Sequence, residues 1–151
     1  MLNCRTEYSF LRAYGRIEDV VARAQQNGWL RAGIADFNST WGHIPLQRQC
    51  AKTGVLPIFG VCLPVVPFIN KDPRYDLVSV IAKSHSGLRA IYELLKKSRE
   101  QRYYRGRVTY AQLYELEGVH LIVDHVSMAN MEHVRRDKCY LSLSPKPGYL
   151  L

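Results

Sequence analysis

The sequence predicts an α/β protein built around a mainly parallel sheet, and three observations support this. Apolar runs with strand character alternate with segments whose apolar residues recur at helical spacing. The 151 residues, 47% of them hydrophobic, suit one domain with a real core. Neither an internal repeat nor a low-complexity linker is visible. Strands that alternate with helices favour a mainly parallel sheet flanked by helices, either open and curved or closed toward a distorted βα barrel.

The first half of the chain is expected to hold three strands and two helices. Strands are predicted at residues 2–5, 32–35 and 55–66. The first helix is indicated by apolar residues at helical spacing, which are Ile17, Val20, Val21 and Ala24, and Gly28 ends it. A second helix is predicted at residues 41–53, closed by Gly54.

The second half repeats this alternation after a polar loop. A buried strand is predicted at residues 77–82, and a helix follows with Leu88, Ile91, Leu94 and Leu95 on one face. Thr109 is expected to cap a short helix that runs to Leu116, and another strand is expected at residues 119–123. The last part is predicted as a helical segment at 128–136, a strand at 138–143 and a tail at 145–151.

Composition narrows the function classes. The formal charge of +8 favours contact with polyanions such as nucleic acid, although basic proteins also bind acidic proteins. A long apolar span and an apolar signal-peptide core are both missing from the sequence, so we expect a cytoplasmic protein without membrane contact. The four cysteines are scattered without CxxC pairs, which predicts buried free thiols rather than zinc ligands or a disulfide framework.

Three ordered segments narrow the prediction from a class to a family: LNCRTEYSFL at residues 2–11, IADFNSTWGHIPLQRQCAKTGVLPIFG at 34–60 and VIAKSHSGLRAIYELL at 80–95. They resemble the polymerase-and-histidinol-phosphatase (PHP) domain at the N-terminus of bacterial DNA polymerase III alpha subunits and of the related error-prone polymerases. A stretch at 103–123 extends the resemblance, which covers roughly residues 2–124. It implies a distorted βα barrel whose strand ends hold metal ions, here shortened to about its first half.

The resemblance also implies which positions would hold the metals, and most of them carry other residues here. Asn3 and Arg5 stand where the family has two histidines, and Arg12 stands where it has an aspartate. In the second motif Asp36 is retained, but Phe37 replaces a histidine, and Cys62 replaces a glutamate. A hydrolytic metal site needs several carboxylates or imidazoles and an open position for water, so neither a metal nor another cofactor is expected.

Two further expectations concern charge at these positions. Arg5 and Arg12 have the sign of the missing metal, and we hypothesise that one of them pairs with Asp36, the alternative being that both point into solvent. The five histidines show no metal-ligand spacing and are expected to be solvated or singly hydrogen-bonded.

A basic and aromatic stretch is the strongest local charge feature of the sequence. It is a candidate surface for nucleic acid or an acidic partner, because cations hold phosphates and tyrosines stack on bases; the alternative is a solvated helix end. Its members are Lys96, Lys97, Arg99, Arg102, Tyr103, Tyr104, Arg105 and Arg107.

The expected organisation is a PHP-like half-domain at residues 1–124 and an extension at 125–151 packed on it. The leading functional hypothesis is a non-catalytic module of DNA replication that binds a polymerase or proofreading-exonuclease subunit. Such a module would be part of a split polymerase, or a phage or mobile-element mimic. The alternatives are a metal-dependent phosphoesterase, which the missing ligands disfavour, and a basic nucleic-acid-binding accessory protein. Polymerase activity by this chain is not expected, because no paired-carboxylate motif for two magnesium ions is visible.

Overall fold

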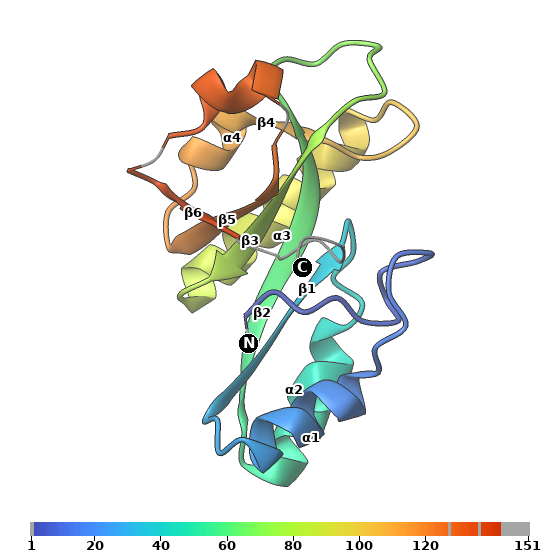
Figure 1. The fold of residues 1–151 in the computed structure, drawn as a ribbon, viewed down its shortest axis with the longest axis vertical. Coiled ribbons are helices and arrows are strands. Elements are labelled where there is room, and N and C mark those ends of the chain that lie inside the picture. Colours follow the sequence, from blue (N-terminus) through green and yellow to red (C-terminus); the bar gives the residue numbers. More distant parts are fainter. Residues whose placement is uncertain (1, 127, 136, 143–151) are drawn as a thin grey trace, which may run out of the picture.

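A computed structural model describes residues 2–126, 128–135 and 137–142 as one six-stranded sheet with helices packed against it (Figure 1). The strands follow the order β1-β2-β3-β5-β6, and β4 pairs with β2 beyond the end of β1. Their bounds are Arg31–Phe37 for β1, Leu56–Val66 for β2, Asp76–Ala82 for β3, Val108–Thr109 for β4, Val119–His125 for β5 and Cys139–Leu141 for β6.

Strand direction confirms the mainly parallel sheet. The pairs β1–β2, β2–β4 and β5–β6 are parallel, and of the strands in the described ranges only β3 runs antiparallel to both of its neighbours, β2 and β5. The carboxyl ends of β1, β2 and β5 therefore meet at one edge of the sheet. In parallel sheets this edge is where loops bring functional side chains together.

Two apolar cores flank the long strand β2. The helices α1 (Ile17–Gln26) and α2 (His43–Thr53) pack beside β1 around Ile34 and Leu46, whereas α3 (His85–Glu100) and α4 (Tyr110–Tyr114) cover the rest of the sheet. Figure 1 shows these two helix pairs at opposite ends of β2. Because β2 contributes to both cores, they form parts of one folded unit.

The helices predicted before residue 117 are confirmed as α1 to α4, and local signals set their ends. The four apolar residues predicted for α1 are all buried. Gly54 adopts the left-handed conformation that ends α2, with φ of 73°. Thr109 caps α4 through a full capping box with Gln112.

The two ends of the described chain differ from the prediction. The strand predicted at residues 2–5 is not formed; the segment pairs with β1 only through an isolated bridge between Cys4 and Ile34. The predicted helix at 128–136 is a 3-10 helix over Met128–His133, and the last strand has three residues. Position 136 and the tail from 143 onward lie outside the described residues.

The cysteines are free, with Cys50 and Cys62 buried as predicted, but Cys4 and Cys139 are partly exposed. Among the described residues, no helix combines the length and apolar character needed to cross a membrane.

Candidate functional site

The sheet face that carries Cys62 and Ser79, here called the inner face, looks away from the α3 core. Cys62 pairs with Phe37 of β1 on one side and with Ser79 of β3 on the other, so the three side chains share this face. Their neighbours Val61 and Val80 point to the opposite face and belong to the core. Side-chain alternation thus places Phe37 and Cys62, two of the positions expected to be vestigial metal ligands, side by side.

A carboxylate that the sequence did not single out lies at the centre of this face. Leu77 pairs with His125 and Val78 with Val123, so Asp124 is the extra residue of a β-bulge in β5. Bulges change the direction of a side chain and are common near functional sites. Here the bulge turns Asp124 toward Ser79 and Cys62.

Asp124 contacts four polar side chains that come from three other segments of the chain. Asn3 Nδ2 donates to its Oδ1 at 2.9 Å, and the Ser79 hydroxyl donates to Oδ2. The Cys62 thiol is 3.6 Å from Oδ2, and an Arg5 guanidinium nitrogen is 3.8 Å from it. Because Asn3 and Arg5 are two apart on an extended segment, both reach the same carboxylate. These five residues are called the Asp124 network below.

Burial keeps the Cys62 thiol protonated within this network. Desolvation raises its pKa to about 11, and the positive charge of Arg5 only partly opposes that shift. Arg5 also donates to the sulfur at 3.3 Å. Cys62 is therefore a neutral, weakly polar member of the network and not a thiolate ligand.

The hypothesis that Asp36 pairs with Arg5 or Arg12 is wrong. The buried Asp36 carboxylate accepts hydrogen bonds from the Thr6 backbone N–H at 2.6 Å, from the Thr6 hydroxyl and from the Ser9 hydroxyl at 2.7 Å. No salt bridge joins it to an arginine within the described chain. Asp36 pairs with Val61 and so lies on the face opposite Cys62, where it fixes the loop that follows Arg5.

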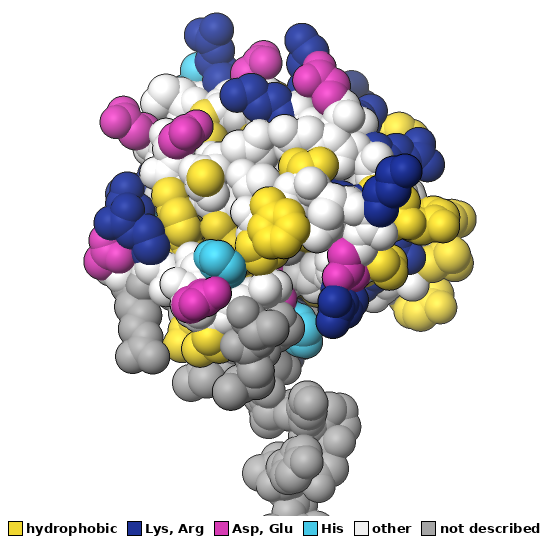
Figure 2. Space-filling model, turned by 90° about the horizontal axis from the view of Figure 1, so that it is seen from above, with side chains coloured by type: hydrophobic (Ala, Val, Ile, Leu, Met, Phe, Trp, Pro, Cys, Tyr) yellow, Lys and Arg dark blue, Asp and Glu magenta, His cyan; other side chains and the backbone are white. Residues whose placement is uncertain are grey.

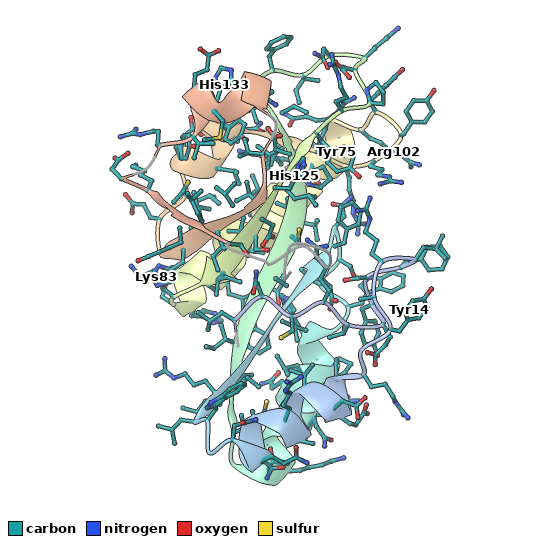
Figure 3. The ribbon with its side chains drawn as sticks, viewed as in Figure 1. Tyr14, Tyr75, Lys83, Arg102, His125 and His133 are labelled. Atoms are coloured by element: carbon teal, nitrogen blue, oxygen red, sulfur yellow. The ribbon has the colours of Figure 1, made fainter. Side chains whose placement is uncertain are left out.

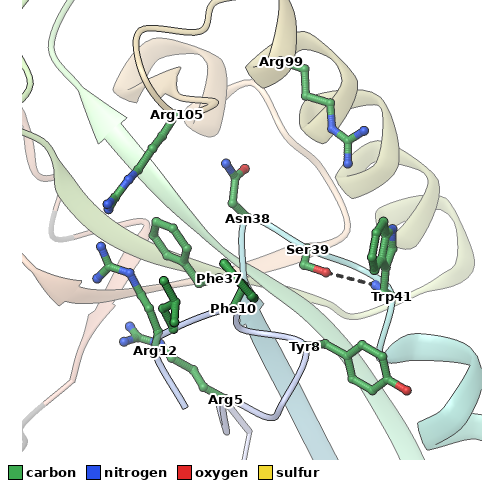
Figure 4. A pocket seen from close by; sticks show the side chains of 11 residues that line it. Arg5, Tyr8, Phe10, Arg12, Phe37, Asn38, Ser39, Trp41, Arg99 and Arg105 are labelled. Carbon is green, nitrogen blue, oxygen red and sulfur yellow. Dashed lines mark hydrogen bonds between the residues drawn. The ribbon is translucent and has the colours of Figure 1, made fainter. Parts of the chain in front are cut away.

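Arg12 occupies a different place, at the rim of the inner face. Its guanidinium lies 4.1 Å from the centre of the Phe37 ring, and one of its nitrogens donates to the Tyr75 hydroxyl at 2.6 Å. Arg105, from the loop after α3, donates to the same hydroxyl at 2.7 Å. Figure 4 shows the guanidinium groups of Arg12 and Arg105 near each other beside Phe37.

These side chains border a pocket of about 640 Å³, called the arginine pocket below. Its cations are Arg5, Arg12, Arg99 and Arg105, and its aromatic residues are Tyr8, Phe10, Phe37 and Trp41. No aspartate or glutamate is among the described residues that line it. Figure 2, which looks onto one end of the molecule, shows Lys and Arg side chains beside a group of hydrophobic ones along one side.

The structure divides the predicted basic stretch into parts with different surroundings. Lys96, Lys97 and Arg99 are exposed on the last turns of α3, and Arg105 reaches the arginine pocket. Arg102 is exposed and donates to the Tyr104 carbonyl at 3.4 Å; Figure 3 shows it in the loop that follows α3.

Arg107 does not belong to this exposed surface. It is only 3% exposed, donates to the Asp72 carbonyl at 2.8 Å and lies 4.9 Å from the centre of the Tyr103 ring. Including it in a surface patch was therefore wrong, because its guanidinium anchors the β2–β3 loop to the chain before β4.

His43 departs from the expectation that the histidines are solvated or singly bonded. It is buried, with Nε2 2.9 Å from the Gly60 carbonyl and Nδ1 3.1 Å from the Tyr92 hydroxyl. Because a carbonyl only accepts, Nε2 carries the proton and Nδ1 accepts from Tyr92. Burial lowers the pKa of His43, so it is a neutral structural residue.

The residues of the inner face do not fit the metal cluster that the fold family implies. Asp124 is the one carboxylate of the network; Arg5 brings a fixed positive charge within 3.8 Å of it, and Phe37 has no ligand atom. In the described part of the chain, no group of three or more His, Cys, Asp or Glu residues has the geometry of a metal site. A cation would have to displace Arg5 and gain further ligands.

Fold and site together define a class: an α/β domain whose polar side chains gather at the carboxyl ends of its strands. The family model described as the PHP domain matches residues 2–137, and the chain belongs to this family.

Several relatives are DNA polymerase III alpha subunits. The chain is 26% identical over 117 residues to the one from Chlamydia pneumoniae, covering 78% of this chain and 9% of the relative. With the subunit from Bacillus subtilis it shares 26% identity over 93 residues, covering 62% of this chain and 8% of the relative. The chain thus spans less than a tenth of the length of these curated relatives.

A solved structure is also similar, that of a protein from Bifidobacterium adolescentis assigned as a metal-dependent phosphoesterase. The TM-score is 0.49 at 18% identity, and the match covers 66% of this chain and 32% of that one.

Proposed function

We propose that this chain is a non-catalytic PHP domain that acts in DNA replication, in the cytoplasm, by binding a polymerase or a proofreading-exonuclease subunit. One observation supports the first part of the proposal, that the domain is non-catalytic. Arg5 lies beside Asp124 at the strand ends, where the family's metal cluster would require ligands. The other donors to Asp124 complete a polar network without an added ion. The alternative, a metal-dependent phosphoesterase, lacks the carboxylates and imidazoles that hydrolysis needs.

The relatives support the second part of the proposal. They are alpha subunits of DNA polymerase III, in which the matching segment is a small part of a much longer chain. A PHP domain without metal chemistry can still serve as a contact surface for other parts of a replication complex. Protein binding then takes the place of catalysis.

An apolar patch at the amino ends of the strands supplies a surface for such a partner. Leu30 is 80% and Leu56 55% exposed, and the Leu56 backbone N–H donates to the Leu30 carbonyl at 2.9 Å, so the two are neighbours. Leu2 lies with Leu56 along a groove of about 700 Å³. Exposed apolar patches of this kind mark protein contacts, and this one lies at the end of β1 and β2 opposite Phe37.

Two measurements test the proposal. The purified chain, supplied with Mn²⁺ or Zn²⁺, is assayed for hydrolysis of bis(p-nitrophenyl) phosphate, and we expect no metal-dependent release of nitrophenol. Separately, the tagged chain is purified from its native host and its bound proteins are identified; a polymerase or exonuclease subunit is expected.

A matched pair of variants makes the second measurement specific. The double substitution Leu30→Glu and Leu56→Glu is expected to abolish recovery of the replication subunit. Phe68→Glu, at an exposed position of the β2–β3 loop, should leave recovery intact. Metal-dependent hydrolysis, or recovery of proteins unrelated to replication, would contradict the proposal.

A further inference from the structure

Two arginines at the rim of the arginine pocket share one neutral acceptor. Arg12 and Arg105 donate to the Tyr75 hydroxyl at 2.6 and 2.7 Å, so the two donating nitrogens lie within roughly 5 Å of each other. Both guanidiniums also lie near the Phe37 ring, at 4.1 and 5.8 Å from its centre. The two residues are far apart in sequence, and the fold holds them together.

No carboxylate neutralises this pair. Neither Arg12 nor Arg105 forms a salt bridge with any residue that the structure describes, and the pocket that they line contains no acidic residue. Like charges at this distance repel by about 1 kcal/mol in bulk water and by more beside low-dielectric walls. An anion bound between the two guanidiniums would replace that repulsion with two charge-assisted hydrogen bonds.

The rest of the pocket indicates what else the anion carries. Phe10 and Trp41 line it with 81% and 76% of their surface exposed, which leaves their rings free to stack on a planar group. Arg99 adds another cation from α3. A volume of about 640 Å³ is in the range of small-ligand sites, which suits one or two nucleotides.

We infer that the arginine pocket binds single-stranded nucleic acid, with one phosphate between Arg12 and Arg105 and an adjoining base stacked on Phe10 or Trp41. Positive grooves combined with exposed aromatic rings are the usual means of holding single strands, whereas the bases of a duplex are not available for stacking. This activity goes beyond the proposed protein contact, and it needs neither a metal nor that partner. The pocket lies at the opposite end of β1 from Leu30 and Leu56.

Fluorescence anisotropy of the full chain with a labelled oligothymidine of about 12 nucleotides tests the inference, since binding sites of this kind span roughly 4–16 nucleotides. Salt-sensitive binding at low ionic strength is expected. The double variant Arg12→Gln and Arg105→Gln should weaken it by roughly tenfold or more. For each phosphate contact that the variant loses, the slope of log K against the logarithm of the salt concentration should become shallower by about 0.7.

The control removes the same charge elsewhere. Arg48→Gln with Arg89→Gln changes two exposed arginines of α2 and α3 that lie outside the pocket, and affinity should change by less than about twofold. Equal reductions in affinity in the two double variants would overturn the inference, because the effect would then be one of net charge alone. Absence of binding at low salt would also overturn it.

A second variant and four competing ligands separate stacking from charge. Trp41→Ala with Phe10→Ala keeps every arginine and is expected to weaken oligothymidine binding by roughly fivefold or more. Thymidine monophosphate is expected to compete more strongly than inorganic phosphate, and an unlabelled oligonucleotide more strongly than either. Three results would each overturn the assignment. Inorganic phosphate could compete as well as the nucleotide, or the aromatic variant could bind as tightly as the wild type. The third is a phosphopeptide that binds more tightly than the oligonucleotide.

Discussion

The Asp124 network and the Arg12–Arg105 pair lie at the same edge of the sheet, yet their charges are arranged in opposite ways. In the network, Arg5 and Asp124 have side chains that are 29% and 11% exposed, and opposite charges lie together with further donors on the carboxylate. In the pair, two like charges share a neutral phenol at the open rim. A charge that is removed from water must be compensated by other groups in the fold. A charge that stays in contact with water is solvated and can remain unpaired until a ligand binds.

Under the two proposals made above, one strand edge has no catalytic chemistry and still offers a binding surface, and this contrast is the physical reason. In the inner part, the polar groups pair with one another around Asp124. The outer part keeps unpaired cations because water screens them. The predictions below test this difference in order of expected effect.

Asp124→Ala is expected to have the largest effect, lowering the free energy of unfolding by about 3 kcal/mol. The substitution leaves Asn3, Arg5 and Ser79 without their shared acceptor in a mostly buried place. Urea denaturation at neutral pH measures this change. Glu93→Ala, at an exposed position of α3, is the control and should change stability by less than about 0.5 kcal/mol. Equal effects would show that the network contributes nothing.

Alkaline pH should weaken the network through Cys62. Its pKa is raised from 9.0 to about 11 in the folded chain, so the unfolded chain loses this proton first. The stability that comes from this shift is present below pH 9 and is lost as the pH rises to about 11, amounting to between roughly 2 and 3 kcal/mol.

The comparison that isolates this thiol is between the wild type and Cys62→Ala, because tyrosines such as Tyr114 also have raised pKa values. Urea denaturation at several pH values between about 8 and 11 should show a shallower fall in the variant. Parallel curves would contradict the buried, neutral thiol.

Arg5→Met and Arg12→Met give a matched pair of smaller effects. Loss of Arg5 is expected to cost about 1.5 kcal/mol, because it leaves the Asp124 charge with neutral donors only. Loss of Arg12 should cost less than about 0.5 kcal/mol, because its charge is solvated and repelled by Arg105. Thermal melting ranks the two variants; an Arg12 variant as unstable as the Arg5 variant would remove the distinction between the two regions.

Much of the fold could be predicted from the sequence because its signals are local. Helical spacing marked α1 and α3, and Gly54 and Thr109 marked the helix ends. The one antiparallel strand, β3, could not be predicted in the same way, because strand direction depends on which neighbour it pairs with.

The site was harder to predict because it depends on pairing register. Asp124 follows a predicted strand, which was a usable signal, but the bulge that turns it onto the inner face appears only when β5 is aligned with β3. The expected contact between Asp36 and an arginine failed because neighbouring strand residues point to opposite faces. Asp36 lies on the face opposite Phe37 and Cys62. Arg5 contacts Cys62 and Arg12 lies over Phe37, so both arginines are on the other face. The meeting of Arg12 with Arg105 rests on tertiary structure alone.

Metal binding by the EDTA-dialysed chain tests most directly whether the Asp124 network stands in place of a metal site. Isothermal titration with Mn²⁺, paired with thermal melting, is expected to show no saturable uptake and no rise in the melting temperature, because the cation would have to displace Arg5 from Asp124. Binding of one ion per chain that raises the melting temperature and disappears in Asp124→Asn would contradict the central claim.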